Sequence, residues 1–381
     1  MLAIVTLTPY GQDDVINKNI HEIAQATGRS LPGFIGDQIA WWMTNEGRFF
    51  PGAVAWTNSI FWVFSSQIAY KLVIGVVLIG AIAGFGMFVS RLTGHRKAGL
   101  VYVAIVLSLI QLRTPHDGVI GYAALLPLTT GLTVAAMVIL ISRRGMGWTL
   151  LAALSYSFAL VTYETVFLFA PIMVAIVVWV RRTWLPALAI AIPAFVQLGI
   201  VATLRVWLHP PTTSGYTINL EPSAVLATFG KQVLAALPLS QWALSAPAVP
   251  TIAAGSIAVG LLLVGIPTFL SIVSLGRSPT LAKREEVIMI AAFGAWIWLS
   301  SAVLISITRR WQVELQPGQG YLSVIYEYFG LALCLLSAYL VVERIVANRL
   351  PRSIPIWRYG SALLISVTAS LTLAGNLSIY N

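Results

Sequence analysis

Charged residues are scarce in this chain of 381 residues, where Asp, Glu, Lys and Arg together make up 9% of the sequence. Hydrophobic residues make up 58%, against roughly 45–50% in ordinary soluble domains. Intrinsic disorder is excluded because it needs low hydrophobicity. Apolar runs of about 17–25 residues recur along the chain, long enough to cross a hydrocarbon core about 30 Å thick. Because these runs are continuous and do not alternate, they exclude a β-barrel and predict an all-α, polytopic transmembrane helix bundle.

Cysteine is almost absent as well. The single residue, Cys334, lies inside an apolar run, which excludes disulfides and thiolate metal sites. The chain lacks the motifs G-x-x-x-x-G-K-[ST], G-x-S-x-G and H-E-x-x-H, so an ATP-driven pump, a serine hydrolase and a zinc protease are disfavoured. His21, His95 and His209 are scattered along the chain, and we therefore expect no zinc site.

Ten apolar segments have the composition of membrane-spanning helices. They are residues 67–90, 98–112, 119–142, 148–163, 164–180, 185–207, 251–275, 287–308, 322–343 and 358–378. The stretch 148–180 is too long for one upright span, so we interpret it as a hairpin with TYET (162–165) near its tip; one long tilted helix is the alternative. The opening MLAIVTL (1–7) is too short to cross and is interpreted as a truncated first span, giving about 10–11 spans. We expect one transmembrane domain over residues 1–381, without a separate soluble domain.

Basic residues are concentrated in five of the connecting segments. Of the 23 Lys and Arg residues, 14 lie in residues 91–97, 143–144, 181–182, 276–286 and 343–358. Cytoplasmic loops of membrane proteins collect Lys and Arg, so this side is predicted to be cytoplasmic, and the net charge of +10 does not indicate a nucleic-acid partner. Residues 9–66, 208–250 and 308–321 are then outer loops. Chemistry is expected there, because loops held by a rigid scaffold carry function.

The outer loops contain candidate amphipathic helices. In DDVINKNIHEIAQATG (13–28), the apolar residues Ile16, Ile20, Ile23 and Ala24 share one face at helical spacing, and Gly28 ends the helix. A second helix is predicted in GDQIAWWMTNEG (36–47), with Asp37 near its start, and a third around 222–237. Trp41 and Trp42 are typical of the headgroup region. We therefore expect these helices to lie on the membrane surface rather than to cross it.

Two adjacent acids, Asp13 and Asp14, stand just after the first apolar residues. One of them could simply cap the helix that follows. A pair is harder to explain in this way, because adjacent like charges repel. One carboxylate can instead accept a proton from a hydroxyl, its pKa raised by its neighbour. The other can orient that hydroxyl or bind a divalent cation. A divalent cation held by Asp13 and Asp14 is the one cofactor that this pattern leaves open.

The order of features after this pair is distinctive. Surface helices follow the Asp pair, and NEGRFFPG (45–52) precedes the next span. In this order the chain resembles the polytopic glycosyltransferases of the GT-C superfamily. The resemblance implies an active site on the outer face of a bacterial inner membrane, a polyprenyl-phosphate-linked sugar as donor, and Asp13 or Asp14 as catalytic base. The implied partners are the lipid bilayer, that donor and a glycan, lipid or protein acceptor.

A donor of this kind requires a phosphate-binding group on the outer side. The Arg guanidinium suits phosphate because its N–H groups match two oxygens at once. Outward candidates are Arg48, Arg113, Arg205, Arg309 and Arg310. We favour Arg309 and Arg310 for the leaving phosphate, followed by Arg48, which shares a loop with the Asp pair. The alternative for each is an interfacial Arg that reaches towards lipid headgroups.

Further candidates for substrate binding lie in the short turns. LRTPHDGVIGY (112–122) places Arg113, His116 and Asp117 together, although Pro115 and Gly118 are equally typical of a plain polar turn. Glu164 lies in or near the hydrocarbon, where acids are costly and indicate function. It could bind a sugar hydroxyl or pair with an outward Arg. Tyr321 and Glu327 combine aromatic and acidic groups that suit sugars, but an interfacial aromatic belt explains them as well.

The predicted reaction is transfer of a sugar from a polyprenyl-phosphate-linked donor to an acceptor hydroxyl. A polysaccharide polymerase or ligase is a related alternative, but it would be expected to use large Arg-rich outer loops. A transporter or flippase of lipid-linked saccharides predicts internal repeats and polar residues at the bilayer midplane. We see no obvious repeat, and the polar residues are concentrated in the outer loops. A non-catalytic assembly subunit with the same fold is the remaining alternative.

Overall fold

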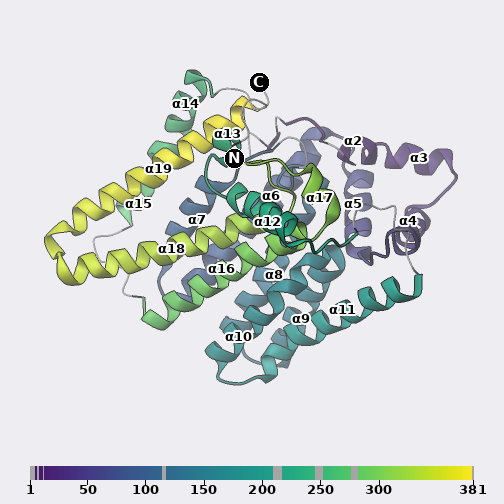
Figure 1. Ribbon diagram of the computed structural model, residues 1–381, viewed down its shortest axis with the longest axis horizontal. Coiled ribbons are helices and arrows are strands. Elements are labelled where there is room, and N and C mark those ends of the chain that lie inside the picture. Colours follow the sequence, from purple (N-terminus) through teal and green to yellow (C-terminus); the bar gives the residue numbers. More distant parts are fainter. Residues whose placement is uncertain are drawn as a thin grey trace.

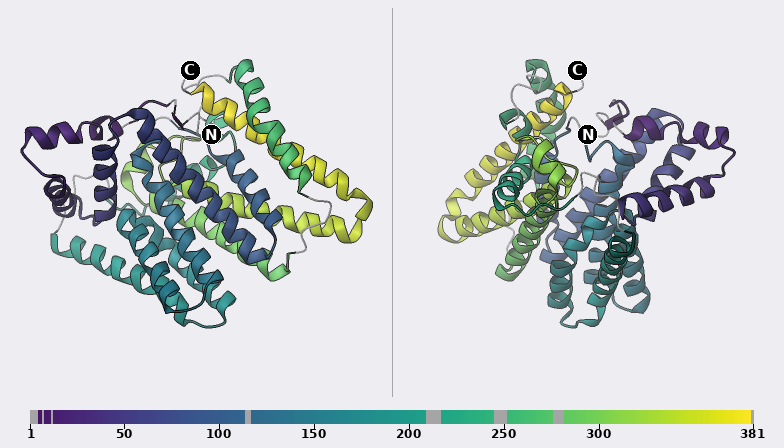
Figure 2. Two further views of the ribbon diagram at one scale, coloured as in Figure 1. Left: turned by 180° about the vertical axis from the view of Figure 1, so that it is seen from behind. Right: turned by 45° about the vertical axis from the view of Figure 1, so that its right-hand side comes forward.

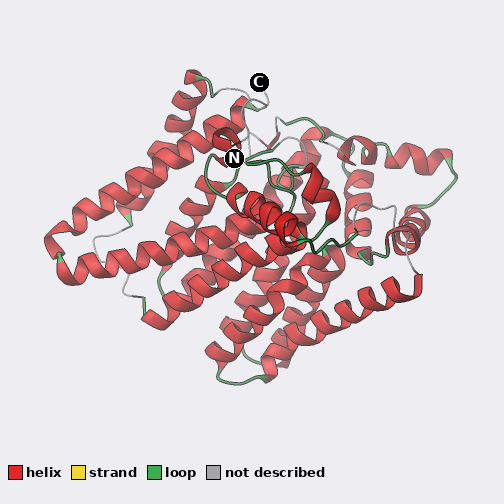
Figure 3. Ribbon diagram, in the orientation of Figure 1, coloured by secondary structure: helices red, strands yellow, loops and turns green. Residues whose placement is uncertain are grey.

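The computed structural model describes residues 5–6, 8–11, 13–113, 117–208, 217–244, 252–275 and 282–379. The side chains of Asp13, Arg205 and Leu208 lie outside the described part, as does most of the predicted truncated span at 1–7. Throughout the described ranges the regular elements are helices, as Figure 3 shows, with one isolated bridge between Ile218 and Thr308. The prediction of an all-α bundle is confirmed.

The α-helices follow one another along the whole chain, and their labels are those of Figure 1. They are α2 (Asp13–Asn17), α3 (Ile20–Ala26), α4 (Leu31–Glu46), α5 (Pro51–Val63), α6 (Gln67–Thr93), α7 (Arg96–Leu109), α8 (Leu125–Ser142), α9 (Met146–Thr162), α10 (Ala170–Arg181), α11 (Leu188–Leu208), α12 (Pro222–Ala235), α13 (Ser240–Leu244), α14 (Ala254–Gly260), α15 (Ile266–Ser274), α16 (Arg284–Ser306), α17 (Arg309–Glu314), α18 (Val324–Arg349) and α19 (Ile354–Ser378). Short turns join some of them: η1 (Tyr122–Ala124), η2 (Glu164–Phe169), η3 (Leu185–Ala187), the π-helical η4 (Leu261–Gly265) and η5 (Pro351–Ser353).

Eight helical stretches of the described chain are long and apolar enough to cross a membrane. They are Gln67–Thr93, Tyr122–Ser142, Glu164–Arg181, Leu185–Leu204, Ala254–Ser274, Arg284–Ser306, Val324–Arg349 and Pro351–Ser378. The predicted spans 98–112 and 148–163 correspond to α7 and α9, which have only 14 and 17 residues. At 1.5 Å per residue they cover about 21 and 26 Å, less than the ~30 Å core. Helices occupy all ten predicted segments; the eight stretches above are long enough to cross by themselves, and α7 and α9 are shorter.

The predicted hairpin at 148–180 is confirmed, which rules out the single tilted helix. Helix α9 ends at Thr162, and Tyr163 has an extended backbone (φ −152°, ψ 109°). Turn η2 then begins at Glu164 and leads into α10. The break at Tyr163 therefore places the tip of the hairpin where the sequence TYET predicts it.

Helices α16 and α18 pack closely where Gly294 and Gly330 face each other. A Cβ on Gly294 would lie 2.6 Å from the Gly330 carbonyl oxygen, so only glycine lets the two backbones approach this closely. Beside this crossing, Phe85 of α6 stacks on Phe329 of α18, with ring centroids 5.0 Å apart. These contacts join α6 to the pair α16–α18 and form the centre of the core.

Several segments assigned to the cytoplasmic side contact one another. Lys97, at the start of α7, is paired with Glu343, near the end of α18, at 2.6 Å. Arg181, at the end of α10, donates a hydrogen bond to the carbonyl oxygen of Leu140 in α8. In Figure 1 the turns after α10 and α18 lie far from α12 and α17, which occupy the middle of the view. Figure 2 shows that the long helices diverge from the region of α12 and α17. The structure therefore separates the basic connections from the connections assigned to the outside; the orientation in the membrane stays a prediction.

The first outer segment folds into four short helices, α2–α5, on the right of Figure 1. The predicted single helix at 13–28 is wrong, because Lys18 and Asn19 form a turn that separates α2 from α3. As a result Ile20 and Ala24 are buried, whereas Ile16 and Ile23 are exposed. Helix α5 lies in a region for which no helix was predicted.

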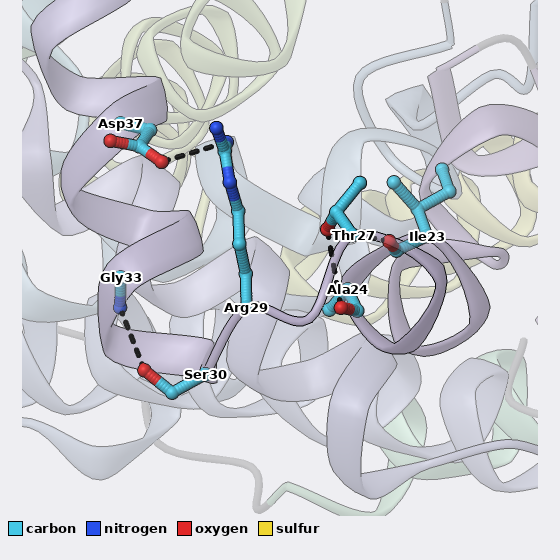
Figure 4. Close-up of polar contacts among 7 residues, drawn as sticks. All are labelled: Ile23, Ala24, Thr27, Arg29, Ser30, Gly33 and Asp37. Carbon is cyan, nitrogen blue, oxygen red and sulfur yellow. Dashed lines mark hydrogen bonds and ion pairs between the residues drawn. The ribbon is translucent and has the colours of Figure 1, made fainter.

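Helix α4 begins five residues before the predicted start at 36. Figure 4 shows why: the Ser30 side chain accepts a hydrogen bond from the Gly33 N–H and caps the helix, and Arg29 pairs with Asp37 at 2.7 Å. The helix ends as predicted at Gly47, whose φ of 59° is in the left-handed region that favours glycine. This end fixes the direction in which the chain leaves towards Arg48.

The second and third outer segments pack on each other. Helix α12 occupies the predicted range around 222–237, and its Lys231 donates a hydrogen bond to the Leu315 carbonyl oxygen at 2.9 Å. Helix α17, which was not predicted, is tied to residues 217–219 through the bridge between Ile218 and Thr308. Both helices lie in the middle of Figure 1, above the core.

Candidate functional site

A cavity of about 610 Å³ opens where four separate segments of the chain meet. Most of its wall comes from α2, α4, α5 and the turn between α4 and α5. The rest comes from Tyr122 and Leu125, from Tyr163 at the hairpin tip, and from Arg310, Trp311, Tyr321 and Leu322. All four segments lie away from the basic connections. The fold thus brings together regions that the charge pattern assigns to the outer side.

Arg48 lines this cavity and is paired with Glu164, 116 positions away in the sequence. The Glu164 Oε1 atom accepts from Arg48 Nε at 2.8 Å and lies 2.7 Å from Nη2. Of the two alternatives stated for Glu164, the structure shows pairing with an Arg. Burial is the largest single effect and disfavours the charged guanidinium, but Glu164, Tyr163 and Tyr321 together outweigh burial and raise the pKa of Arg48 above its ordinary value. Arg48 therefore carries its charge at any pH at which the protein is studied.

Aromatic rings surround the Arg48 guanidinium. Its central carbon lies 4.5 Å from the Phe50 ring centroid, 5.9 Å from that of Trp42 and 6.0 Å from that of Tyr163. Cations are attracted to the faces of aromatic rings. The sequence assigned Trp42 to the headgroup region, but it linked none of these rings to Arg48, because nothing local to Phe50 or Tyr163 marks them as neighbours of Arg48.

Arg310 also lines the cavity, but Arg309 does not. Arg310 is held by Glu314, one helical turn on, at 3.0 Å, and its guanidinium carbon lies 4.9 Å from the Trp311 ring centroid. Trp311 in turn stacks on Tyr321 with ring centroids 3.7 Å apart. Arg309 is exposed and does not line the cavity. Of this predicted pair, only Arg310 is placed to meet a ligand there.

Asp14 is completely buried, with 0% of its surface exposed, and does not line the cavity. Its Oδ2 accepts a hydrogen bond of 2.6 Å from the Tyr70 hydroxyl, and that hydroxyl accepts another from the Ala123 N–H at 3.1 Å. Asp14 therefore connects α2, the start of α6 and the turn before α8. Asp13 is the first residue of α2, while its side chain lies outside the described part.

The turn that Tyr70 holds has an unusual backbone. Tyr122, Ala123 and Ala124 have φ values of 55°, 49° and 57° in succession, a region that residues other than glycine adopt at a cost of about 1–2 kcal/mol each. Trp56 donates to the Ala123 carbonyl oxygen at 2.7 Å, and the buried Lys71 donates to that of Ile120 at 2.7 Å. Strained backbone of this kind is typical of functional sites. Here it places Tyr122 in the cavity wall.

Arg113 lies outside the cavity wall and is 3% exposed. It donates through Nη2 to the Ala235 carbonyl oxygen at 2.5 Å, through Nη1 to the carbonyl oxygens of Gly318 and Gln319, and through Nε and Nη2 to the Tyr328 hydroxyl at 2.9 and 2.7 Å. These contacts occupy the whole guanidinium. Arg113 thus holds the loop before Tyr321 rather than facing a ligand.

The remaining candidates are dispersed. Asp117 accepts from the backbone N–H groups of Arg113, Val119 and Ile120 at 2.5, 2.6 and 3.0 Å; burial raises the pKa of Asp117 above its ordinary value, and these N–H groups oppose the rise. His116 lies outside the described residues. Glu327 is completely buried and accepts from Gln232 at 2.8 Å. Among the predicted site residues whose side chains the structure describes, only Arg48, Arg310 and Tyr321 line the cavity, and Glu164 is paired with Arg48.

Tyr70, Lys71 and Trp311 contribute to the site and its supporting turn but were not predicted from the sequence. A charge inside an apolar run is a signal of function, and Lys71, in the first turns of α6, carries that signal. Within the described side chains, no cluster of three His, Cys, Asp or Glu residues could hold a metal ion. The proposed cation site at Asp13 and Asp14 therefore stays a prediction.

No protein-family model and no curated protein matches this chain. Among solved structures, it is similar to the crystal structure of ArnT from Cupriavidus metallidurans bound to undecaprenyl phosphate. The alignment covers 100% of this chain and 76% of the ArnT chain, with 13% sequence identity and a TM-score of 0.40. A likeness at this level carries no inference about the activity of this chain.

Proposed function

We propose that this protein is a membrane glycosyltransferase of the GT-C type, which transfers a sugar from a polyprenyl-phosphate-linked donor to an acceptor hydroxyl. The observation that carries the proposal is the cavity, where two arginines and several aromatic rings meet at the end of a helix bundle. Guanidinium groups suit a phosphate, and aromatic faces suit the CH faces of a sugar. The order of sequence motifs that resembles GT-C enzymes is independent support.

The residues take distinct roles in this proposal. The acceptor hydroxyl gives its proton to Asp13, its oxygen attacks the anomeric carbon, and the phosphate leaves from the opposite face with the bonding electrons. Arg48 and Arg310 stabilise the negative charge that develops on the leaving phosphate. We assign the base to Asp13 because Asp14 is buried away from the cavity and held by Tyr70. Asp14 then positions α2, and the bundle confines the lipid donor to the interface.

The test uses purified protein in lipid nanodiscs and a panel of polyprenyl-phosphate sugars, with sugar transfer to a membrane extract as the readout. Asp13→Asn is expected to lower transfer at least about 100-fold, the usual contribution of a general base, while the melting temperature stays at the wild-type value. Asp14→Asn is expected to lower both transfer and the melting temperature. Asp37→Asn is the matched control, because Asp37 lies in the same outer segment and its side chain is 58% exposed.

The outcomes separate the parts of the proposal. Transfer at the wild-type rate by Asp13→Asn would remove Asp13 from the role of base. Absence of transfer by the wild-type protein with every donor in the panel would count against the glycosyltransferase itself. In that case the protein is reconstituted into proteoliposomes, and movement of a labelled lipid-linked saccharide across their membrane would favour the flippase alternative.

A further inference from the structure

Arg48 is held along one edge only. Its Nε and Nη2 atoms both contact the same oxygen, Glu164 Oε1, at 2.8 and 2.7 Å. A guanidinium group offers two edges that can each bind an anion: the side edge formed by Nε and one Nη atom, and the end formed by both Nη atoms. Glu164 occupies the side edge. Among the described residues, Nη1 has no hydrogen-bond or ion-pair partner.

Arg48 lines the cavity, whereas its partner Glu164 is not part of the cavity wall. Both side chains keep 22% of their surface exposed, so Arg48 is neither sealed in the core nor free in solvent. Phe50, Trp42 and Tyr163 surround the guanidinium and limit its rotation. Its direction is therefore set before any ligand arrives.

We propose that Glu164 is a positioning residue, which holds Arg48 by its side edge so that the two Nη atoms present their N–H groups to a single phosphate group in the cavity. The ligand class is a phosphate monoester, carried either by a lipid or by a small soluble molecule. The inference rests on the proposed function only for the identity of that ligand. Preorganisation of this kind strengthens binding because less conformational freedom is lost when the ligand binds.

Arg310 provides an internal contrast. Its Nε atom contacts both oxygens of Glu314, and the two residues are neighbours on one short helix with side chains 35% and 49% exposed. That pair is formed by local helix geometry. The Arg48–Glu164 pair joins the turn after α4 to the hairpin tip, so the tertiary structure alone creates it.

Binding is measured by calorimetry on detergent-purified protein with three probes: a ten-carbon isoprenyl monophosphate, the corresponding alcohol, and inorganic phosphate. Arg48→Ala is expected to weaken binding of the isoprenyl phosphate at least 10-fold, and Glu164→Ala about 10-fold. Glu164→Gln is expected to bind at the wild-type affinity or more tightly, because the amide oxygen accepts from the same edge of Arg48. The alcohol is expected to bind equally to all variants. Binding of the isoprenyl phosphate but not of inorganic phosphate identifies a lipid-borne ligand, and binding of both identifies the phosphate group as sufficient.

A purely structural ion pair is distinguished by exchanging the two charges. The double variant Arg48→Glu/Glu164→Arg is expected to recover the melting temperature that either single change lowers, but not the binding of the isoprenyl phosphate. The proposal is overturned if Glu164→Ala binds this probe as tightly as wild type, if Glu164→Gln binds as weakly as Glu164→Ala, or if the exchanged pair restores binding. Phosphate binding with these effects, but without sugar transfer, would uphold the positioning role and reject the proposed reaction.

Discussion

Arg48 and Arg113 are both arginines that the charge pattern assigns to the outer side, yet their surroundings differ. Every N–H direction of Arg113 is used by the carbonyl oxygens of Ala235, Gly318 and Gln319 and by the Tyr328 hydroxyl. Arg48 meets one carboxylate oxygen and several rings, and its Nη1 has no partner within the described chain. Arg113 thus behaves as part of the scaffold and Arg48 as part of a binding site. Residue type alone does not distinguish the two arginines. The number of guanidinium N–H groups that have a hydrogen-bond acceptor does.

The distinction between scaffold and binding site also applies to two stretches of backbone, the one that begins at Ile110 and the first outer segment. Residues 110–113 and 117–121 form no regular helix, and side chains from other helices hold parts of this stretch in place. Asn376 accepts from the Leu112 N–H at 2.8 Å and donates to the Ile110 carbonyl oxygen at 3.0 Å. The first outer segment, by contrast, has local caps and exposed pairs. Changes in residues 110–113 and 117–124 should therefore destabilise the fold, and changes in the first outer segment should alter binding first.

The largest effect on stability is expected for Arg113→Ala. The change removes the Arg113 donor from the carbonyl oxygens of Gly318 and Gln319 and from the Tyr328 hydroxyl, whereas the Ala235 carbonyl oxygen still accepts from Ser240. At about 1 kcal/mol for each lost donor, a loss of about 3 kcal/mol is expected. Arg48→Ala, which leaves the largely buried Glu164 carboxylate without its partner, should cost less, about 1–2 kcal/mol. Thermal unfolding in one detergent, followed by tryptophan fluorescence, measures both. Equal losses would erase the distinction between scaffold and site.

An intermediate effect is expected for Tyr70→Phe. The ring remains stacked on Phe61, with centroids 4.5 Å apart, but Asp14 loses this hydroxyl donor and the Ala123 N–H loses its acceptor. The expected loss of stability is about 1–3 kcal/mol. Hydrogen exchange at residues 121–124 should rise in the same variant. Unchanged exchange there would show that Tyr70 does not hold the strained turn.

A smaller effect is expected for Gly47→Ala. The φ of 59° at this position costs a residue with a Cβ about 1–2 kcal/mol. Because Gly47 sets the direction of the chain before Arg48, phosphate binding should weaken together with stability. Gly36→Ala, in the middle of α4 with open space around a Cβ, is the control and should be neutral or slightly stabilising. Gly47→Ala is measured by the same unfolding and calorimetry; wild-type stability would contradict the strained turn.

The smallest effect is expected for Arg29→Ala. The pair with Asp37 is drawn in Figure 4, and its side chains are 51% and 58% exposed. Exposed ion pairs contribute about 0–1 kcal/mol, so the melting temperature should hardly change, and phosphate binding should match wild type. A loss as large as that of Tyr70→Phe would show that α4 depends on this pair.

Much of the fold could be predicted because helix-forming signals are local. The ten helical segments, the break at Tyr163, helix α12 and the end of α4 at Gly47 all follow from apolar length, glycine and capping. The turn at Lys18 and Asn19, helix α5 and helix α17 do not, because their short sequences are as compatible with loops as with helices. Packing against the bundle decided them.

The candidate site was only partly predictable for the same reason. Arg48, Glu164, Arg310 and Tyr321 are conspicuous in an apolar chain, and the sequence singled them out. Which of them meet is a matter of long-range contact, since Arg48 and Glu164 are 116 positions apart and Arg113 and Tyr328 are 215 apart. The burial of Asp14 could not be anticipated either, because nothing in the sequence around Tyr70 indicates that Tyr70 contacts Asp14.

By itself, the sequence determined that this is a helical membrane protein whose basic residues are sorted into particular connections, because the cost of placing charge in hydrocarbon is imposed on each segment separately. The tertiary structure alone decided which arginine faces the cavity, which acid is buried, and that four distant segments form one wall. Those outcomes depend on the satisfaction of buried donors and acceptors across the whole fold. No single segment contains that information.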